Sequence, residues 1–123
     1  HEAMHGRWKA AAESFRLALQ DMPENAAARY LLAMAHLESG EPARAAALLE
    51  QALQLDPDLK ALYVNLAVAR LRLGHYDEAA EASAAGLKRH PENVHCQYNL
   101  GVALFARAVR LASHSSATAA PAV

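Results

Sequence analysis

Hydrophobic residues recur along most of the chain at spacings of three and four, the period of an α-helix that buries one face. Two of these stripes consist of Trp8, Phe15 and Leu19, and of Leu48, Leu49 and Leu53. Glycines and prolines interrupt the pattern at regular intervals. The pattern predicts helices at about residues 8–20, 26–39, 42–54, 60–73, 76–89 and 94–112. Residues 1–5 are interpreted as the end of a further helix.

The interruptions have a fixed period of 34 residues. It separates Gly6, Gly40 and Gly74, and likewise Pro23, Pro57 and Pro91. Two further registers agree, one containing Ala11, Ala45 and Ala79 and the other Leu19, Leu53 and Leu87. Agreement of four registers over three copies indicates an internal helix–turn–helix repeat.

Each repeated residue type has a physical reason. Glycine ends a helix at low cost because it accepts a positive φ. Proline ends the second helix because the residue before it disfavours the helical conformation. The small alanines let two antiparallel helices approach closely, and residues on the first helices form the matching packing stripe. These residues are Leu32, Ala33 and His36; Leu66, Ala67 and Arg70; and Leu100, Gly101 and Leu104.

The 34-residue unit resembles the tetratricopeptide repeat. Its best copy has Tyr63, Leu66 and Ala67 in the first helix, then Gly74, Tyr76 and Ala79, and finally Pro91. Three departures are Arg29 in place of the large aromatic residue, Pro42 in place of tyrosine, and Gly86 in place of Ala52. The resemblance covers roughly residues 1–107 and implies an all-α fold of antiparallel helix pairs, stacked as a right-handed α-solenoid.

On this pattern, residues 1–112 form the repeat array. It comprises a half repeat (1–25), two repeats (26–59 and 60–93) and a second half repeat (94–112). Residues 113–123 are rich in Ser and Ala and lack an apolar period, so we expect a disordered tail. Half repeats at both ends favour a fragment of a longer repeat protein.

Composition supports helices and excludes several partners. Alanine accounts for 31 of the 123 residues, and alanine has the highest helix propensity. The formal charge of −1 provides no basic face for nucleic acid, and no apolar run is long enough for membrane insertion. The compartment stays open, with a soluble, cytoplasmic protein slightly favoured.

The family resemblance also implies a concave groove lined by the first helix of each repeat. Its expected peptide-binding residues are Tyr30, Leu31, Met34, Val64, Asn65, Val68, Arg72, His95, Tyr98, Asn99, Val102 and Phe105. An apolar face of this extent favours a bound ligand or a covering segment.

Two specific groove types can be compared with this set. A carboxylate clamp of the family needs two Lys, two Asn and an Arg, and only Asn65 matches; Tyr30, Met34, His95 and Asn99 occupy the other positions. Asn65 and Asn99 instead resemble an asparagine ladder, which holds a peptide main chain because an amide both donates and accepts hydrogen bonds. Leu31 breaks that ladder, and a purely structural role for the two asparagines stays open.

No residue pattern indicates catalysis, a cofactor or a metal. Ser14, Ser39 and Ser83 lack a paired histidine and acid, and phosphate-binding glycine loops are absent. His1 and His5 have a spacing that can bind a metal, but no third ligand is near. His36 is interpreted as a half-buried packing residue, and Cys96 as a free thiol.

The sequence therefore predicts a non-enzymatic interaction module that binds a peptide segment of a partner protein. The alternatives are a structural or assembly segment that stacks on itself or on a following domain, and the regulatory arm of a larger enzyme. The two half repeats also predict weak end-to-end self-association, with Trp8, Leu104 and Leu111 exposed at opposite ends.

Overall fold

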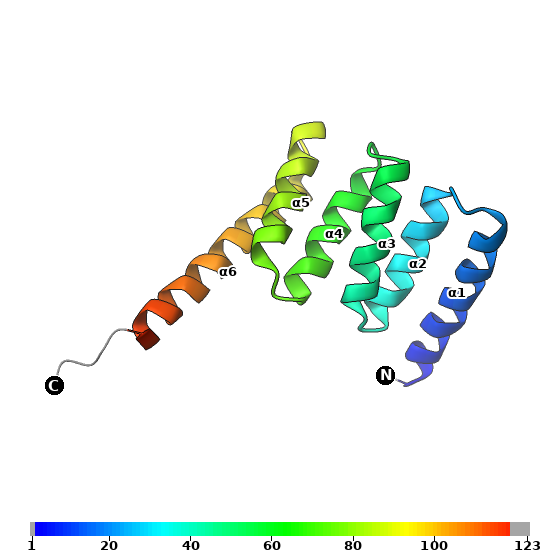
Figure 1. The fold of residues 1–123 in the computed structure, drawn as a ribbon, viewed down its shortest axis with the longest axis horizontal. Coiled ribbons are helices and arrows are strands. Elements are labelled where there is room, and N and C mark those ends of the chain that lie inside the picture. Colours follow the sequence, from blue (N-terminus) through cyan, green and yellow to red (C-terminus); the bar gives the residue numbers. More distant parts are fainter. Residues whose placement is uncertain (1, 119–123) are drawn as a thin grey trace.

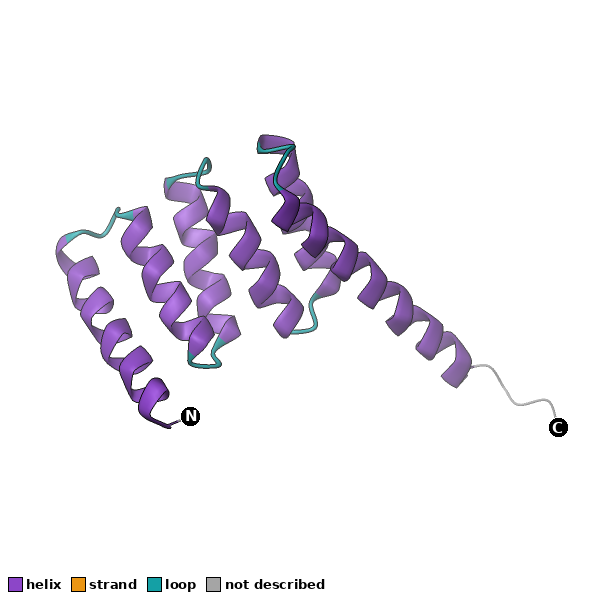
Figure 2. Ribbon diagram, turned by 180° about the vertical axis from the view of Figure 1, so that it is seen from behind, coloured by secondary structure: helices purple, strands orange, loops and turns teal. Residues whose placement is uncertain are grey.

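The computed structural model describes residues 2–118, which form six α-helices and no β-strand. The helices are α1 (Glu2–Asp21), α2 (Ala26–Glu38), α3 (Pro42–Leu55), α4 (Lys60–Arg72), α5 (Tyr76–Arg89) and α6 (Val94–Thr118). They stand side by side in chain order, and successive helices run in opposite directions (Figures 1 and 2). The predicted all-α helical-repeat solenoid is confirmed. Within the described range, no helix is long and apolar enough to cross a bilayer.

The predicted helix ends at two glycines are confirmed. Gly40 and Gly74 have φ values of 79° and 75°. Across each turn the next residue donates its N–H back to the helix, from Glu41 to the His36 carbonyl at 2.8 Å and from His75 to the Arg70 carbonyl at 2.9 Å. These bonds satisfy carbonyl groups that a helix end leaves without partners, and the positive φ that allows them is inexpensive only for glycine.

The predicted break at Gly6 is wrong, because α1 starts at Glu2 and runs through this glycine. Glycine permits a positive φ but does not require one. Only one helical turn precedes Gly6, and among the described residues it has no packed helix from which to reverse. A glycine inside a helix costs about 1 kcal/mol relative to alanine, which the rest of α1 tolerates.

The predicted end of the last helix is also wrong. Helix α6 continues to Thr118, so residues 113–118 of the expected disordered tail are helical, while residues 119–123 lie outside the described range. Ala108 explains the difference. It stands 34 residues after Gly74, and alanine continues a helix where glycine would end it.

Two arginines on either side of Ala108 hold this part of α6 against the start of α5. Nε of Arg107 lies 3.2 Å from Oδ1 of Asp77. The guanidinium of Arg110 lies over the ring of Tyr76, 4.2 Å from its centroid, in a cation–π contact. The position at which glycine would end the helix is therefore flanked by contacts with the preceding repeat.

Long polar side chains fasten α2 and α4 to the loops that precede them. The Tyr63 hydroxyl donates a hydrogen bond to the Pro57 carbonyl at 2.5 Å. In the same register of the previous repeat, the Arg29 guanidinium donates to the Pro23 carbonyl at 2.6 Å. Arginine in place of the family's aromatic residue thus preserves the hydrogen bond while changing the side chain that makes it.

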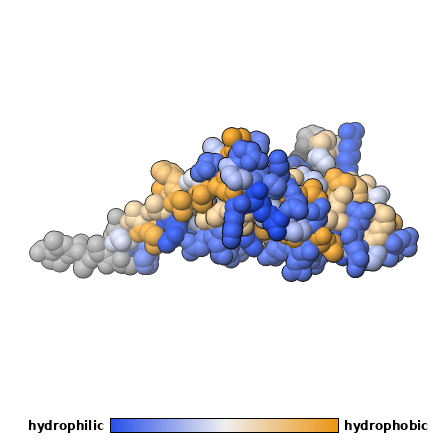
Figure 3. Space-filling view, turned by 90° about the horizontal axis from the view of Figure 1, so that it is seen from above, coloured by the Kyte–Doolittle hydropathy of each residue, from blue (hydrophilic) through white to orange (hydrophobic). Residues whose placement is uncertain are grey.

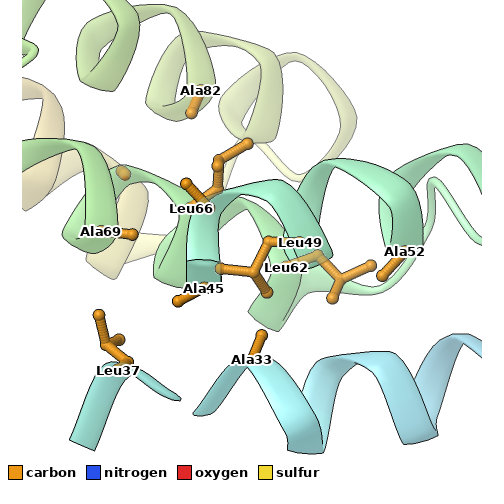
Figure 4. Close-up of a cluster of buried hydrophobic side chains, with 11 residues drawn as sticks. Ala33, Leu37, Ala45, Leu49, Ala52, Leu62, Leu66, Ala69 and Ala82 are labelled. Atoms are coloured by element: carbon orange, nitrogen blue, oxygen red, sulfur yellow. The ribbon is translucent and has the colours of Figure 1, made fainter. Parts of the chain in front are cut away.

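The core lies where α3 and α5 pack onto α2 and α4. Its buried members are mostly Ala and Leu, namely Ala33, Leu37, Ala45, Ala46, Leu49, Ala52, Leu62, Leu66, Ala67, Ala69 and Ala82. Figure 4 shows Ala33 of α2 pointing toward α3, on the side of α3 that carries Ala45, Leu49 and Ala52. Alanine side chains leave little between the helix backbones, so the few leucines fill the remaining space.

Burial in the core depends on how many helices surround a residue. Leu49 is fully buried, as predicted, but Phe15 in the same register of α1 is only half-buried. The reason is that α3 packs extensively on both α2 and α4, whereas α1 has one extensive partner, α2. The prediction that Phe15 is buried between helices is therefore wrong.

We expect Leu49→Ala to lower the free energy of unfolding by about 2–5 kcal/mol, because it leaves a cavity among immobile neighbours. Phe15→Ala should cost clearly less, since half of the ring already contacts water. Urea denaturation followed by circular dichroism gives both values. Equal losses at the two sites would contradict this packing.

Gly86 of α5 lies in close contact with both α4 and α6. A Cβ atom there would lie 2.6 Å from Sγ of Cys96 and 2.8 Å from Cβ of Tyr63. Both neighbours are buried, and the Tyr63 atom is fixed to the backbone. The departure of Gly86 from the alanine of the previous repeat therefore accommodates the larger Tyr63 and the thiol of Cys96. The same burial raises the pKa of that thiol.

Gly86→Ala should destabilise the protein by about 1–3 kcal/mol, because backbone-anchored atoms must move apart. Gly101→Ala is the matched control, since that glycine is also helical and its Cβ would meet nothing within 4 Å. The control should be neutral or stabilising by up to about 1 kcal/mol. Thermal denaturation of both variants checks this, and a neutral Gly86→Ala would disprove the close approach.

Candidate functional site

The twelve predicted groove residues lie on the first helices α2, α4 and α6, and their side of these helices is called the groove face below. Tyr30, Met34 and Val68 are half-buried and pack against the core cluster. Tyr98 and Phe105 are both 72% exposed. The most exposed of these five side chains thus lie on α6. Figure 3 shows apolar surface beside the grey C-terminal residues.

Two hollows bring predicted residues together. The first, of about 430 Å³, lies where the start of α4 meets the α5–α6 turn and includes Val64, Asn65 and His95. Nζ of Lys60 and Oε1 of Glu92, at its rim, are 3.7 Å apart. The rest of its lining consists of Ala61, Asn93 and Val94.

The second hollow, of about 390 Å³, lies along α6. Tyr98, Val102 and Phe105 line it, together with Gln97 and Gly101. Six of the twelve predicted residues therefore line one of the two hollows. Tyr30, Leu31 and Met34 of α2 line neither of them.

The two asparagines of the predicted ladder reach across to the preceding first helix. The Asn65 amide donates to the Ala61 carbonyl at 2.9 Å and to the Tyr30 hydroxyl at 3.4 Å. The Asn99 amide donates to the Val64 carbonyl at 3.3 Å, and Asn99 is only 7% exposed. Both N–H groups of Asn65 therefore have protein partners, and the two residues fasten the first helices to one another.

Arg72 also has an internal partner. Its guanidinium donates to the Leu37 carbonyl, 35 residues earlier, at 3.1 Å. This bond supplies a donor to the C-terminal end of α2, where carbonyl groups lack helical partners. Leu31 of α2, in the register of Asn65 and Asn99, is 43% exposed.

Two tetratricopeptide repeat models match the sequence, one over residues 36–97, which is half of the chain, and one over residues 4–60. The chain belongs to the tetratricopeptide repeat family. No curated protein sequence matches it. The family explains why α2, α4 and α6 share a face, because each is the first helix of its tetratricopeptide repeat.

Solved structures of tetratricopeptide repeat domains have the same fold. The Sgt2 domain of Aspergillus fumigatus is 23% identical, with a TM-score of 0.80 over 98% of this chain and 80% of that one. The first such domain of Spaghetti (RPAP3), bound to an HSP90 peptide, is 21% identical, with a TM-score of 0.79 over 84% of this chain and 82% of that one. An O-GlcNAc transferase mutant of Thermobaculum terrenum is 30% identical, with a TM-score of 0.71 over 85% of this chain and 20% of that protein.

Val94 lines the first hollow and is strongly exposed, yet the groove prediction did not include it. The family analogy starts the groove at the second residue of each repeat, and Val94 is the first. The sequence does contain a signal, because Val94, Tyr98 and Val102 are spaced by four and form one helical stripe.

The remaining histidine predictions concern packing and metal binding. His36 is half-buried, and its Nδ1 lies 3.1 Å from Oε1 of Glu41. This hydrogen bond lowers the pKa of the Glu41 carboxyl group. His1 lies outside the described residues, and within them no three potential metal ligands come together.

Replacing Asn99 with Asp keeps the size of the side chain but removes the N–H donor and places a charge at a buried site. We expect Asn99→Asp to cost about 1–3 kcal/mol of stability. Asn93→Asp is the matched control, because Oδ1 of Asn93 accepts hydrogen bonds from the His95 and Cys96 N–H groups at a helix start, where a carboxylate serves equally well. Chemical denaturation at neutral pH gives the free energy of unfolding of both variants. Equal losses in the two variants would show that the Asn99 donor is unimportant.

Proposed function

We propose that this chain is a protein-interaction module that binds a peptide segment of a partner protein on its groove face, and that it is not itself a catalyst. The observation that carries the proposal is the exposure of Tyr98, which is 72% exposed and lines the hollow along α6. An aromatic side chain left in water at a concave site is an anchor for a ligand. Peptide binding by the similar domain of Spaghetti (RPAP3) supports the same use of the fold.

The chemistry of the groove face favours a ligand with apolar side chains over an acidic chain end. The positions that would need Lys and Arg in a carboxylate clamp hold Tyr30, His95 and Asn99. Both donors of Asn65 already have protein partners, so its amide offers mainly its oxygen to a ligand. Affinity would then come mostly from apolar burial around Tyr98 and Val102, at about 25 cal/mol per Å² of apolar surface removed from water.

A regulatory arm of a larger enzyme is the second candidate. It is favoured by the 30% identity to the Thermobaculum terrenum transferase, of which this chain spans 20%. In that case the groove face would hold a substrate protein or another part of the same enzyme. The binding chemistry would be the same, and only the origin of the bound segment would differ.

A displayed library of random peptides, selected on the chain at nanomolar concentration, tests the proposal. Tyr98→Glu should weaken the selected peptides at least tenfold in fluorescence anisotropy, because the anchor is lost and a charge enters the hollow. The variant should fold normally, since Tyr98 is exposed. Val68 is unsuitable for this test because it packs against the core cluster.

The control for this experiment is Leu55→Glu, which introduces the same charge at an exposed leucine of α3. It should leave peptide affinity within about twofold. Peptides that bind the Tyr98→Glu variant as tightly as the wild type would place the binding surface elsewhere on the solenoid.

A further inference from the structure

Helix α6 has an apolar face that no other helix covers within the described residues. The face consists of Leu100, Gly101, Leu104, Ala108 and Leu111 and is called the α6 end face. In the register of Gly101, Ala33 and Ala67 are fully buried beneath α3 and α5. Gly101 itself is exposed, and a Cβ atom there would meet nothing within 4 Å. The α6 end face thus resembles the faces of α2 and α4 on which α3 and α5 pack, but within the described residues no helix packs on it.

Helix α1, at the other end of the solenoid, also has a face that is less buried than the equivalent faces of α3 and α5. Ala45 of α3 and Ala79 of α5 are fully buried, but Ala11, in the same register of α1, is only half-buried. The side of α1 that faces away from α2 consists of Ala10, Ala11, Ser14 and Leu17 and is called the α1 end face. Leu17 on this face is 48% exposed, nearly the same as Leu104 at 47%. Among the described residues, helix α1 therefore has the residues of a second helix without the first helix of its repeat beside it.

We propose that the α1 end face of a second copy of this chain docks on the α6 end face, in the way that α3 packs on α2. In the α2–α3 hairpin, residues at equal distances from the peptide bond between Gly40 and Glu41 lie opposite each other. The 34-residue register transfers this pairing to the contact between copies and sets Leu104 opposite Ala11 of the second copy. Continuing the two antiparallel helices beyond the position of the turn sets Leu111 opposite Met4 of the second copy.

The lengths of the two helices support a second copy as the occupant. Helix α3 begins at Pro42, but α1 begins six residues before Trp8, which has the same register. Helix α6 in turn continues past Ala108, where α2 and α4 have already ended. In the antiparallel arrangement the two extensions lie beside each other, so exposed Met4 and Leu111 cover one another.

The next helix of the docked copy fits as well. Leu37 of α2 is 2% exposed because the array continues beyond it, whereas Phe105 in the same register is 72% exposed. Helix α2 of the second copy would cover Phe105 as α4 covers Leu37. Its exposed Leu31, in the register of Asn65, would approach Tyr98 as Asn65 approaches Tyr30. Leu31, which breaks the asparagine ladder, and Phe105 are both apolar, and both would lie at this junction.

Such a contact joins two different surfaces, so each copy keeps one free α1 end face and one free α6 end face. Head-to-tail contacts of this kind extend into open chains unless the rotation closes a ring. We therefore expect the average mass to increase continuously with concentration, rather than to reach a plateau at a dimer.

Sedimentation velocity across a hundredfold concentration range tests the proposal with two single variants of the whole chain. Leu104→Glu removes the α6 end face and Leu17→Glu removes the α1 end face, and both side chains are exposed enough for the fold to survive. Each variant alone should stay monomeric. An equimolar mixture should form a one-to-one dimer and nothing larger, because each variant supplies the face that the other lacks.

Leu55→Glu is the control and should associate like the wild type; circular dichroism confirms that all variants are helical. A wild type that stays monomeric throughout the range overturns the proposal, and so does a mixture of the two variants that remains monomeric. Association of the Leu17→Glu variant on its own would instead indicate a symmetric contact between two α6 end faces, which also contradicts it. Peptide affinity at nanomolar concentration should be unchanged in Leu104→Glu, so failure of this proposal and of groove binding can be told apart.

Discussion

The structure depends on one constraint, the close packing of each second helix between two first helices. In α3 this is achieved by Ala45, Leu49 and Ala52, all fully buried. Alanines bring the backbones together, and one leucine fills the space that remains. Because the contact involves backbone as well as side chains, one methyl group in the wrong place has no room, as Gly86 demonstrates. The rotation between repeats follows from these contacts, and with it the position of the groove face.

The same constraint explains why residues in one register differ in exposure. Leu49 and Phe15 occupy equivalent positions, yet only the residue with helices on both sides is fully buried. Leu37 and Phe105 show the same contrast at the other end. Exposure in this protein is therefore a property of a residue's place in the array as much as of its type. The apolar surface of α6 follows from its having no second helix packed on it within the described residues.

Most of the fold could be predicted because its signals are local and repeated. A glycine followed 17 residues later by a proline fixes the ends of a helix, and both residues act through their own backbone geometry. Gly6 shows the limit of this reasoning, because a glycine ends a helix only when a packed helix precedes it. In α6 the register of Gly40 and Gly74 is occupied by Ala108. Because no glycine ends the helix there, α6 continues to Thr118.

The candidate site was less predictable because side-chain partners come from helices 34 residues away. The sequence indicates that Asn65 and Asn99 share a face, but not that their N–H groups are used within the protein. Asparagines that bind a peptide main chain and asparagines that hydrogen-bond to the neighbouring helix have the same sequence pattern. Only the distances to Tyr30 and to the Val64 carbonyl distinguish them.

The groove face and the α6 end face share one helix, so their ligands are thermodynamically linked. Tyr98 belongs to the groove, whereas Phe105 lines a groove hollow and also lies where a docked copy would cover it. A peptide that buries Phe105 would compete with the second copy, while a peptide confined to the hollow at Val64 and His95 would leave docking unaffected. Linkage requires the effect to be reciprocal, so a competing peptide weakens self-association by the factor by which self-association weakens the peptide. The position of a peptide along α6 therefore decides whether its binding dissociates the head-to-tail assembly or leaves the assembly intact with peptide bound to it.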